Sequence, residues 1–217
     1  MSSRESSGLR ADAVRNRQRV LAAARATFAE DGLDASTNEI ARRAGVGIAT
    51  LLRRFPTREG LVAAVFAEKV ASYHAAAEAA LQEADPWVGL CSYIERVCEM
   101  QAEDYGFADL FTTQAFPSPP ELRDARDRAA DALATIMERA QATGALRPDF
   151  EHQDLPLFLM ANAGVVAATR HVAPDAWRRV AAYLIQSLAS PAAQPLPPAP
   201  SRAQVYAAMT RVEPKPH

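Results

Sequence analysis

Apolar side chains recur along most of this chain at the three- to four-residue spacing of an amphipathic helix. Over residues 12–31, for example, Val14, Leu21 and Phe28 recur every seven residues, and Gly32 follows. Such a stripe predicts a helix with one buried face that ends at a glycine. The chain has no run of alternating Val, Ile and Thr of the kind that indicates a strand. The pattern therefore predicts an all-α protein.

Two short helices are expected next, joined by a glycine turn. Ser36 and Glu39 have the spacing of a capping box, in which each side chain bonds the other residue's amide, so the first helix should begin at Thr37. Gly45 suits the left-handed position that ends a helix, and the second helix should cover residues 48–54. Two short helices around a glycine turn predict a helix-turn-helix.

We expect the second of these helices to contact DNA. In a helix-turn-helix it enters the major groove, while nearby arginines suit the phosphates. A plain helical hairpin with a solvated basic rim is the alternative, but the capping box, the glycine turn and the following Phe-Pro-Thr-Arg-Glu favour DNA. The expected DNA-binding residues are Thr37, Arg42, Arg43, Gly47, Ile48, Ala49, Thr50, Leu52, Arg53, Arg54 and Arg58.

Residues 44–61, which read AGVGIATLLRRFPTREGL, resemble the signature of the TetR family of transcriptional repressors, and the pattern over residues 15–66 resembles it too. An aromatic residue that often contacts DNA in the family is replaced here by Leu52, which should make only an apolar contact. Such departures concern the operator sequence rather than the mode of binding. They fall at Gly47, Ile48, Ala49 and Leu52.

The resemblance implies an N-terminal three-helix helix-turn-helix domain and a C-terminal helical bundle for ligand binding and dimerisation. A connecting helix capped by Thr57 should run to about Leu81. A later helix, at 157–171, is apolar on nearly all sides, and the resemblance pairs it and the next helix with a second copy. Further helices are expected at 86–104, 107–115, 122–143 and 174–189. The expected domains are 1–56, 57–190 and a proline-rich tail, 191–217, that is disordered or loosely docked.

The resemblance also implies a small-molecule effector, whose identity the sequence does not give. Two functions stay open. One is a ligand-responsive regulator, expected to be a repressor that binds a palindromic operator as a homodimer and is released by the effector. The other is a ligand-blind regulator whose helical body only dimerises. The residues that could line an effector cavity are Trp87, Cys91, Ile94, Cys98, Tyr105, Phe111, Gln114, Met137 and Asn162. Taken alone, each of them also fits a position in the core.

Charge is unevenly distributed along the chain, although the formal net charge is only −2. Residues 1–66 carry 11 Lys and Arg against 7 Asp and Glu, whereas residues 67–217 carry 13 against 19. A basic head on an acidic body fits a DNA-binding end and a separate effector body.

No pattern in the sequence indicates catalysis or a metal site. Cys91 and Cys98 would lie roughly 10 Å apart on one helix, too far for a disulfide, and no Cys-x-x-Cys or His-x-x-x-His pair accompanies them. The four histidines lie beside no nucleophile arrangement, and no phosphate-binding glycine loop occurs. We therefore expect no enzyme, metal or cofactor. Without a secretory signal or a long apolar run, we expect a soluble cytoplasmic protein.

Overall fold

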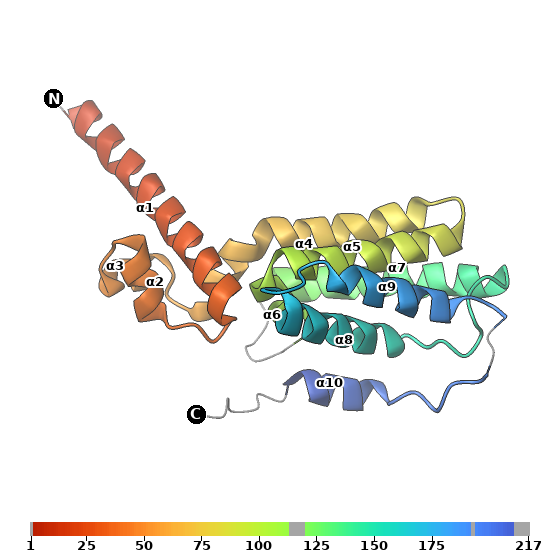
Figure 1. The fold of residues 1–217 in the computed structure, drawn as a ribbon. Coiled ribbons are helices and arrows are strands. Elements are labelled where there is room, and N and C mark those ends of the chain that lie inside the picture. The colour runs from red at the N-terminus through yellow and green to blue at the C-terminus, as the bar shows by residue number, and fades with distance from the viewer. Residues whose placement is uncertain (1, 113–119, 192–193, 211–217) are drawn as a thin grey trace. The chain divides into compact units, whose positions relative to one another are not determined.

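The computed structural model describes residues 2–112, 120–191 and 194–210 (Figure 1). Over these residues the chain is helical, with one isolated bridge between Leu146 and Ala189 and no strand, which confirms the predicted all-α fold. No helix in these ranges is long and apolar enough to cross a membrane. The helices are α1 (Ser2–Asp31), α2 (Thr37–Ala44), α3 (Ile48–Arg54), α4 (Arg58–Gln82), α5 (Pro86–Glu103), α6 (Tyr105–Thr112), α7 (Pro120–Ala142), α8 (Asp154–Thr169), α9 (Ala176–Leu188) and α10 (Arg202–Thr210).

The chain forms two compact units, Met1–Glu68 and Lys69–His217. Helix α4 is continuous across this division, so its first turns belong to the first unit and its remainder to the second. The domain limit expected after residue 56 falls within the loop before α4 and stays a prediction.

The first unit is built around the C-terminal part of α1. Phe28 and Phe66 are fully buried, and their rings stack with centroids 6.0 Å apart. Ile40 and Leu51 complete the same core from α2 and α3. Helix α1 begins at Ser2 rather than at residue 12. The added segment contains no proline, and its single glycine costs only about 1 kcal/mol in a helix, so the helix can extend through it.

Helix α5 forms the centre of the second unit. As expected, Pro86 occupies its first position, and the Asp85 carboxylate accepts hydrogen bonds from the amides of Trp87 (2.9 Å) and Val88 (3.4 Å). The helix packs against α6, α7, α8 and α9. The side chains that it buries in this way include Leu90, Tyr93, Ile94, Val97, Cys98 and Met100.

Several helix ends in the second unit differ from prediction by two or three residues. Helix α8 begins at Asp154 rather than at 157, because Pro156 lies in its first turn, where proline breaks no helical hydrogen bond. The other differences are that α6 begins at Tyr105 instead of 107, α7 begins at Pro120 instead of 122, α8 ends at Thr169 instead of 171, and α9 begins at Ala176 instead of 174. The expected end of α6, at residues 113–115, lies outside the described residues.

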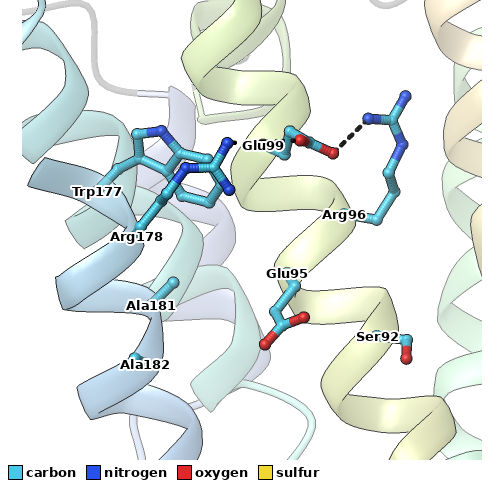
Figure 2. Close-up of a pocket in the computed structure, with 8 residues that line it drawn as sticks. All are labelled: Ser92, Glu95, Arg96, Glu99, Trp177, Arg178, Ala181 and Ala182. Carbon is cyan, nitrogen blue, oxygen red and sulfur yellow. Dashed lines mark hydrogen bonds and ion pairs between the residues drawn. The ribbon is translucent and has the colours of Figure 1, made fainter. Parts of the chain in front are cut away.

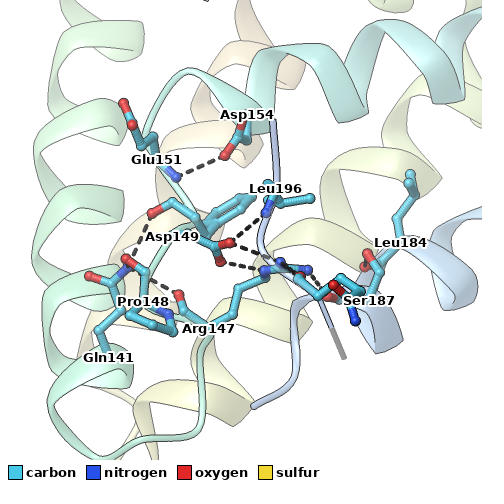
Figure 3. A network of polar contacts seen from close by, with 11 residues as sticks. Gln141, Arg147, Pro148, Asp149, Glu151, Asp154, Leu184, Ser187 and Leu196 are labelled. Carbon is cyan, nitrogen blue, oxygen red and sulfur yellow. Dashed lines mark hydrogen bonds and ion pairs between the residues drawn. The ribbon is translucent and has the colours of Figure 1, made fainter. Parts of the chain in front are cut away.

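The proline-rich tail is bonded to the second unit near its beginning (Figure 3). Buried Arg147 pairs with the Asp149 carboxylate (Nε to Oδ1, 2.6 Å) and donates to the main-chain carbonyls of Ser187 (3.2 Å) and Gln194 (2.8 Å). Asp149 also accepts from the Leu196 amide at 2.8 Å. The Arg147 guanidinium and this amide hold the pKa of Asp149 well below its usual range. Of the two expectations for the tail, disordered or loosely docked, these hydrogen bonds support docking at Gln194 and Leu196, because a buried guanidinium needs such acceptors.

Candidate nucleic-acid interface

Helix α2 begins at Thr37, as predicted, but not through a capping box. Ser36 occupies the N-cap position with extended backbone, and its side chain makes no capping hydrogen bond. The Glu39 carboxylate instead accepts from Arg42 (Nε, 2.7 Å) and Arg43 (Nε, 2.8 Å) on its own helix. These charged donors lie three and four residues ahead, within reach on the same face, and are stronger partners than the Ser36 amide.

The turn between α2 and α3 depends on Gly45. Its φ of 64° places it in the left-handed region, and the amides of Gly45 and Val46 donate to the carbonyls of Arg42 and Ala41, both at 3.1 Å. This closure ends α2 and allows Gly47 to start α3 with extended backbone. The predicted helix-turn-helix is thus formed by residues 37–54.

Helix α3 has one buried and one exposed face. Leu51 and Phe55 are 1% and 7% exposed, and they anchor the helix on the core of the first unit. Ile48 and Leu52 are 39% and 48% exposed. Of the other residues expected at DNA, Thr50 is half-buried, and the exposed ones are Gly47, Ala49, Arg53 and Arg54.

Four of the five arginines expected at DNA fall into two electrostatic groups. Arg42 and Arg43 share the Glu39 carboxylate, and Arg43 also bonds Glu30 (Nη1 to Oε2, 2.6 Å). The hydrogen bonds from Arg42 and then Arg43 lower the pKa of Glu39 to about 2, so both cations face a permanent anion. Arg53 and Arg54, in contrast, have no ion-pair or hydrogen-bond partner in the described part of the chain.

Arg58 points into the first unit rather than toward solvent. Its guanidinium donates to the main-chain carbonyls of Leu33 and Ala35 (2.7 Å for the latter) and lies 5.9 Å from the centre of the Phe28 ring. Arg58 Nη1 also donates to the hydroxyl of Thr37, another residue expected at DNA, at 3.5 Å. Partial burial lowers the pKa of Arg58. Arg58 thus joins the start of α4 to the turn between α1 and α2.

The residues expected to line an effector cavity divide by burial. Phe111 belongs to α6, but its side chain lies outside the described residues, as does the whole of Gln114. Trp87, Cys91 and Tyr105 are half-buried. The remaining four are at most 2% exposed, namely Ile94, Cys98, Met137 and Asn162.

A polar pair that the sequence only partly revealed lies between α5 and α8. Gln101 and Asn162 are both 0% exposed, and Asn162 Nδ2 donates to Gln101 Oε1 at 2.8 Å and to the Cys98 carbonyl at 3.4 Å. Gln101 Nε2 donates to the Leu159 carbonyl at 3.2 Å. Asn162 Oδ1 is buried and accepts no hydrogen bond in the described part of the structure. Gln101 was not expected in the site, although a glutamine within the apolar stripe of α5 was the available signal.

A surface groove of about 390 Å³ lies between α5 and α9, apart from these residues (Figure 2). Three of its four charged side chains pair with one another, because Glu99 contacts Arg96 at 2.7 Å and Arg178 at 3.8 Å. The Arg178 guanidinium also lies 4.5 Å from the Trp177 ring centre. None of the predicted effector residues is among those that line it, which are Ser92, Glu95, Arg96, Glu99, Trp177, Arg178, Ala181 and Ala182.

The two cysteines are free thiols. Burial is the main cause that raises the pKa of Cys91 to about 11 and that of Cys98 to about 12. Thiols of this kind are weak nucleophiles and poor metal ligands at neutral pH. Within the described ranges, no cluster of His, Cys, Asp and Glu side chains could hold a metal ion.

A helix-turn-helix followed by a helical bundle defines a class of DNA-binding regulators, and comparison with known proteins identifies the family. Residues 20–65 match the family model of bacterial regulatory proteins of the tetR family, and residues 85–189 match that of the SbtR-like transcriptional regulator C-terminal domain. A TetR transcriptional regulator from Streptomyces coelicolor is 32% identical, with 81% of this chain and 99% of that chain covered and a TM-score of 0.51. The chain belongs to the TetR family.

Two further solved structures share the fold. PfmR from Thermus thermophilus is 26% identical over 77% of this chain and 96% of that chain, with a TM-score of 0.53. FadR from Bacillus subtilis, solved in complex with stearoyl-CoA, is 18% identical over 79% and 98%, with a TM-score of 0.57. No curated protein sequence matches the chain. As a TetR regulator, the protein is a DNA-binding transcriptional regulator and not an enzyme, and regulators of this family act as dimers.

Proposed function

We propose that this protein is a repressor that binds a palindromic operator as a dimer and is released by a small molecule. The observation that carries the DNA-binding part is the contrast among the arginines of the first unit. Arg42 and Arg43 are neutralised by carboxylates, whereas Arg53 and Arg54 end α3 with uncompensated charge on its exposed face. Unpaired guanidinium groups on such a helix suit guanine edges or phosphates.

Binding to a duplex selected from a random pool tests this assignment. Arg53→Ala and Arg54→Ala should each weaken binding by about 1–3 kcal/mol if the contact is bidentate to a base. If the contact is to phosphate, the loss should be uniform across sequences and the salt dependence should fall. Arg42→Ala is the matched control, because it removes the same charge from a residue already paired with Glu39. Unchanged binding by a folded double variant would rule out these arginines.

The proposed dimer seam consists of α8 and α9. Leu157 on α8 and Tyr183 on α9 are 38% and 58% exposed in a single copy, and the two helices pack together. Apart from Leu157, the exposed residues of α8 are small, namely Ala161, Gly164, Ala167 and Ala168, and small residues allow a second helix to approach closely.

Sedimentation velocity at micromolar concentration tests the seam. Leu157→Glu and Tyr183→Glu should give monomers, because each places a charge in an apolar contact. Val88→Glu is the control, since Val88 is similarly exposed (46%) but lies on α5. A wild-type monomer, or dimers in all three variants, would contradict the proposed seam.

The buried polar pair supports an effector site in the second unit. An unmet buried acceptor costs about 1–3 kcal/mol, and a molecule that donates a hydrogen bond to Asn162 Oδ1 would remove that cost. A body that only dimerised would gain nothing from such a group in its core. Val97 and Val166, which lie one turn from Gln101 and Asn162 on their helices, are buried and apolar, so the effector should combine an apolar body with a hydrogen-bond donor.

A thermal-shift screen followed by a DNA-release assay tests the effector proposal. Long-chain acyl-CoA enters the screen because the similarly folded FadR was solved with stearoyl-CoA. A molecule that raises the melting temperature and dissociates the duplex supports release by an effector. Asn162→Leu should keep DNA binding and lose this response. Molecules that stabilise the protein without releasing DNA would favour the ligand-blind regulator.

We propose that α4 transmits the effector signal, because it is one continuous helix with residues in both units. An effector can shift the spacing of the two DNA-binding heads only through its different affinity for the two spacings. Spin labels on α1 of each copy should therefore report a changed distance on effector binding. DNA release without a change in distance would mean that the effector acts by another route.

A further inference from the structure

The exposed face of α3 is unusual for a helix that enters a polar groove, because the large exposed side chains that precede its two arginines are apolar. Ile48 and Leu52 are four residues apart, so they lie on one side of the helix, next to the stripe that buries Leu51 and Phe55. Gly47 comes directly before Ile48, and a Cβ built on Gly47 would meet no atom of the described residues within 4 Å. The surface beside Ile48 is therefore open. The uncompensated cations, Arg53 and Arg54, follow only at the end of the helix.

The major groove offers few partners for such a surface. Each base edge there consists of hydrogen-bond donors and acceptors, except for the 5-methyl group of thymine. An isoleucine or leucine side chain placed against a guanine or cytosine edge would remove polar groups from water without pairing them, which is unfavourable. Against a thymine methyl group, the same side chain buries apolar surface on both sides.

Two side chains are too small a patch for a protein partner, since specific protein interfaces bury about 1,200 Å² or more. Their neighbours also favour DNA, because Arg53 and Arg54 carry positive charge beside them. We propose that Ile48 and Leu52 read thymine methyl groups, so that each operator half-site carries thymines beneath the first turns of α3. This inference rests on the proposed insertion of α3 into the major groove.

Replacement of thymine by deoxyuridine tests the inference, because it removes only the methyl group and leaves base pairing intact. The duplex is first selected from a random pool by the wild-type protein, and each thymine is then replaced singly. At contacted positions, the wild-type protein should bind about three- to fivefold more weakly, the effect of one buried methyl group. Leu52→Ala or Ile48→Ala should bind the thymine and deoxyuridine duplexes equally at the position that it contacts.

Arg54→Ala is the matched control, since it should weaken binding to both duplexes equally and keep the deoxyuridine penalty. Equal binding of thymine and deoxyuridine duplexes by the wild-type protein at every position would overturn the inference. So would a penalty that persists in both alanine variants, because the methyl groups would then act through the shape of the DNA. The proposal that α3 binds DNA is tested separately, since it is refuted if Arg53→Ala and Arg54→Ala leave binding unchanged.

Discussion

The polar pair in the core should show strong energetic coupling between Gln101 and Asn162. Gln101→Met removes the acceptor of the 2.8 Å hydrogen bond, so that Asn162 keeps only the 3.4 Å bond to Cys98 while its Oδ1 stays unmet. We expect this variant to lose about 1–3 kcal/mol of unfolding free energy. Asn162→Leu alone leaves Gln101 Oε1 unmet but removes the unmet Oδ1, so the two effects largely cancel.

The double variant contains none of these polar atoms and should be as stable as the wild-type protein or more stable. Asn162→Leu should therefore stabilise the protein by about 1–3 kcal/mol more when Gln101→Met is present than when it is absent. Urea unfolding followed by circular dichroism measures this difference, at one protein concentration because regulators of this family act as dimers. Gln82→Met, at an exposed glutamine at the end of α4 and outside the proposed dimer seam, is the control and should change stability by less than about 0.5 kcal/mol.

Additivity of the two single effects within about 0.5 kcal/mol would refute this reasoning. It would mean that the hydrogen bond between Gln101 and Asn162 contributes nothing that depends on both side chains.

Gly89→Ala should lower the unfolding free energy by about 1–3 kcal/mol in the same assay, because a Cβ would lie 2.5 Å from the Ala80 carbonyl oxygen; an unchanged midpoint would show that α4 and α5 can separate there without cost. Cys98 should resist alkylation by iodoacetamide at pH 8 in the native protein and react once urea unfolds it, because burial raises its pKa to about 12; rapid native labelling would contradict its burial. The pKa of Glu39 is lowered from 4.5 to about 2, so its stabilising effect should be complete above pH 4.5 and disappear as the pH falls toward 2. The melting temperatures of the Glu39→Gln and wild-type proteins should converge over that range. A constant difference would mean that the ionised Glu39 carboxylate is not the source of the stabilisation.

Local chain chemistry made the helix-turn-helix predictable. Gly45 and Pro56 fix where α2 and α3 end, and the apolar spacing of Leu51 and Phe55 identifies the buried face of α3. The capping box failed because the sequence pattern does not reveal which of several nearby donors Glu39 prefers. Once the helix has formed, two arginines on the same face compete better than a backbone amide.

The sequence could not reveal the hydrogen-bond partners of Arg58 and Gln101, because those partners are distant in the chain. The carbonyls that Arg58 bonds lie 23 and 25 residues before it, and the carbonyl that Gln101 bonds lies 58 residues after it. An arginine beside a helix-turn-helix suits phosphate as well as it suits a main-chain carbonyl. Only the folded backbone shows that the carbonyls are within reach.

The contacts of Arg58 limit which parts of the DNA-binding unit can move separately. Arg58 is the first residue of α4, and its guanidinium holds the turn that leads into α2, while Phe66, two turns later, stacks on Phe28 of α1. The first turns of α4 and the helix-turn-helix therefore behave as one rigid piece with no internal hinge. A rotation of these turns should therefore carry α3 with it. Under the proposed function, a change in the spacing of the two DNA-binding heads would therefore have to arise beyond Phe66 in α4, or in the pairing of two copies.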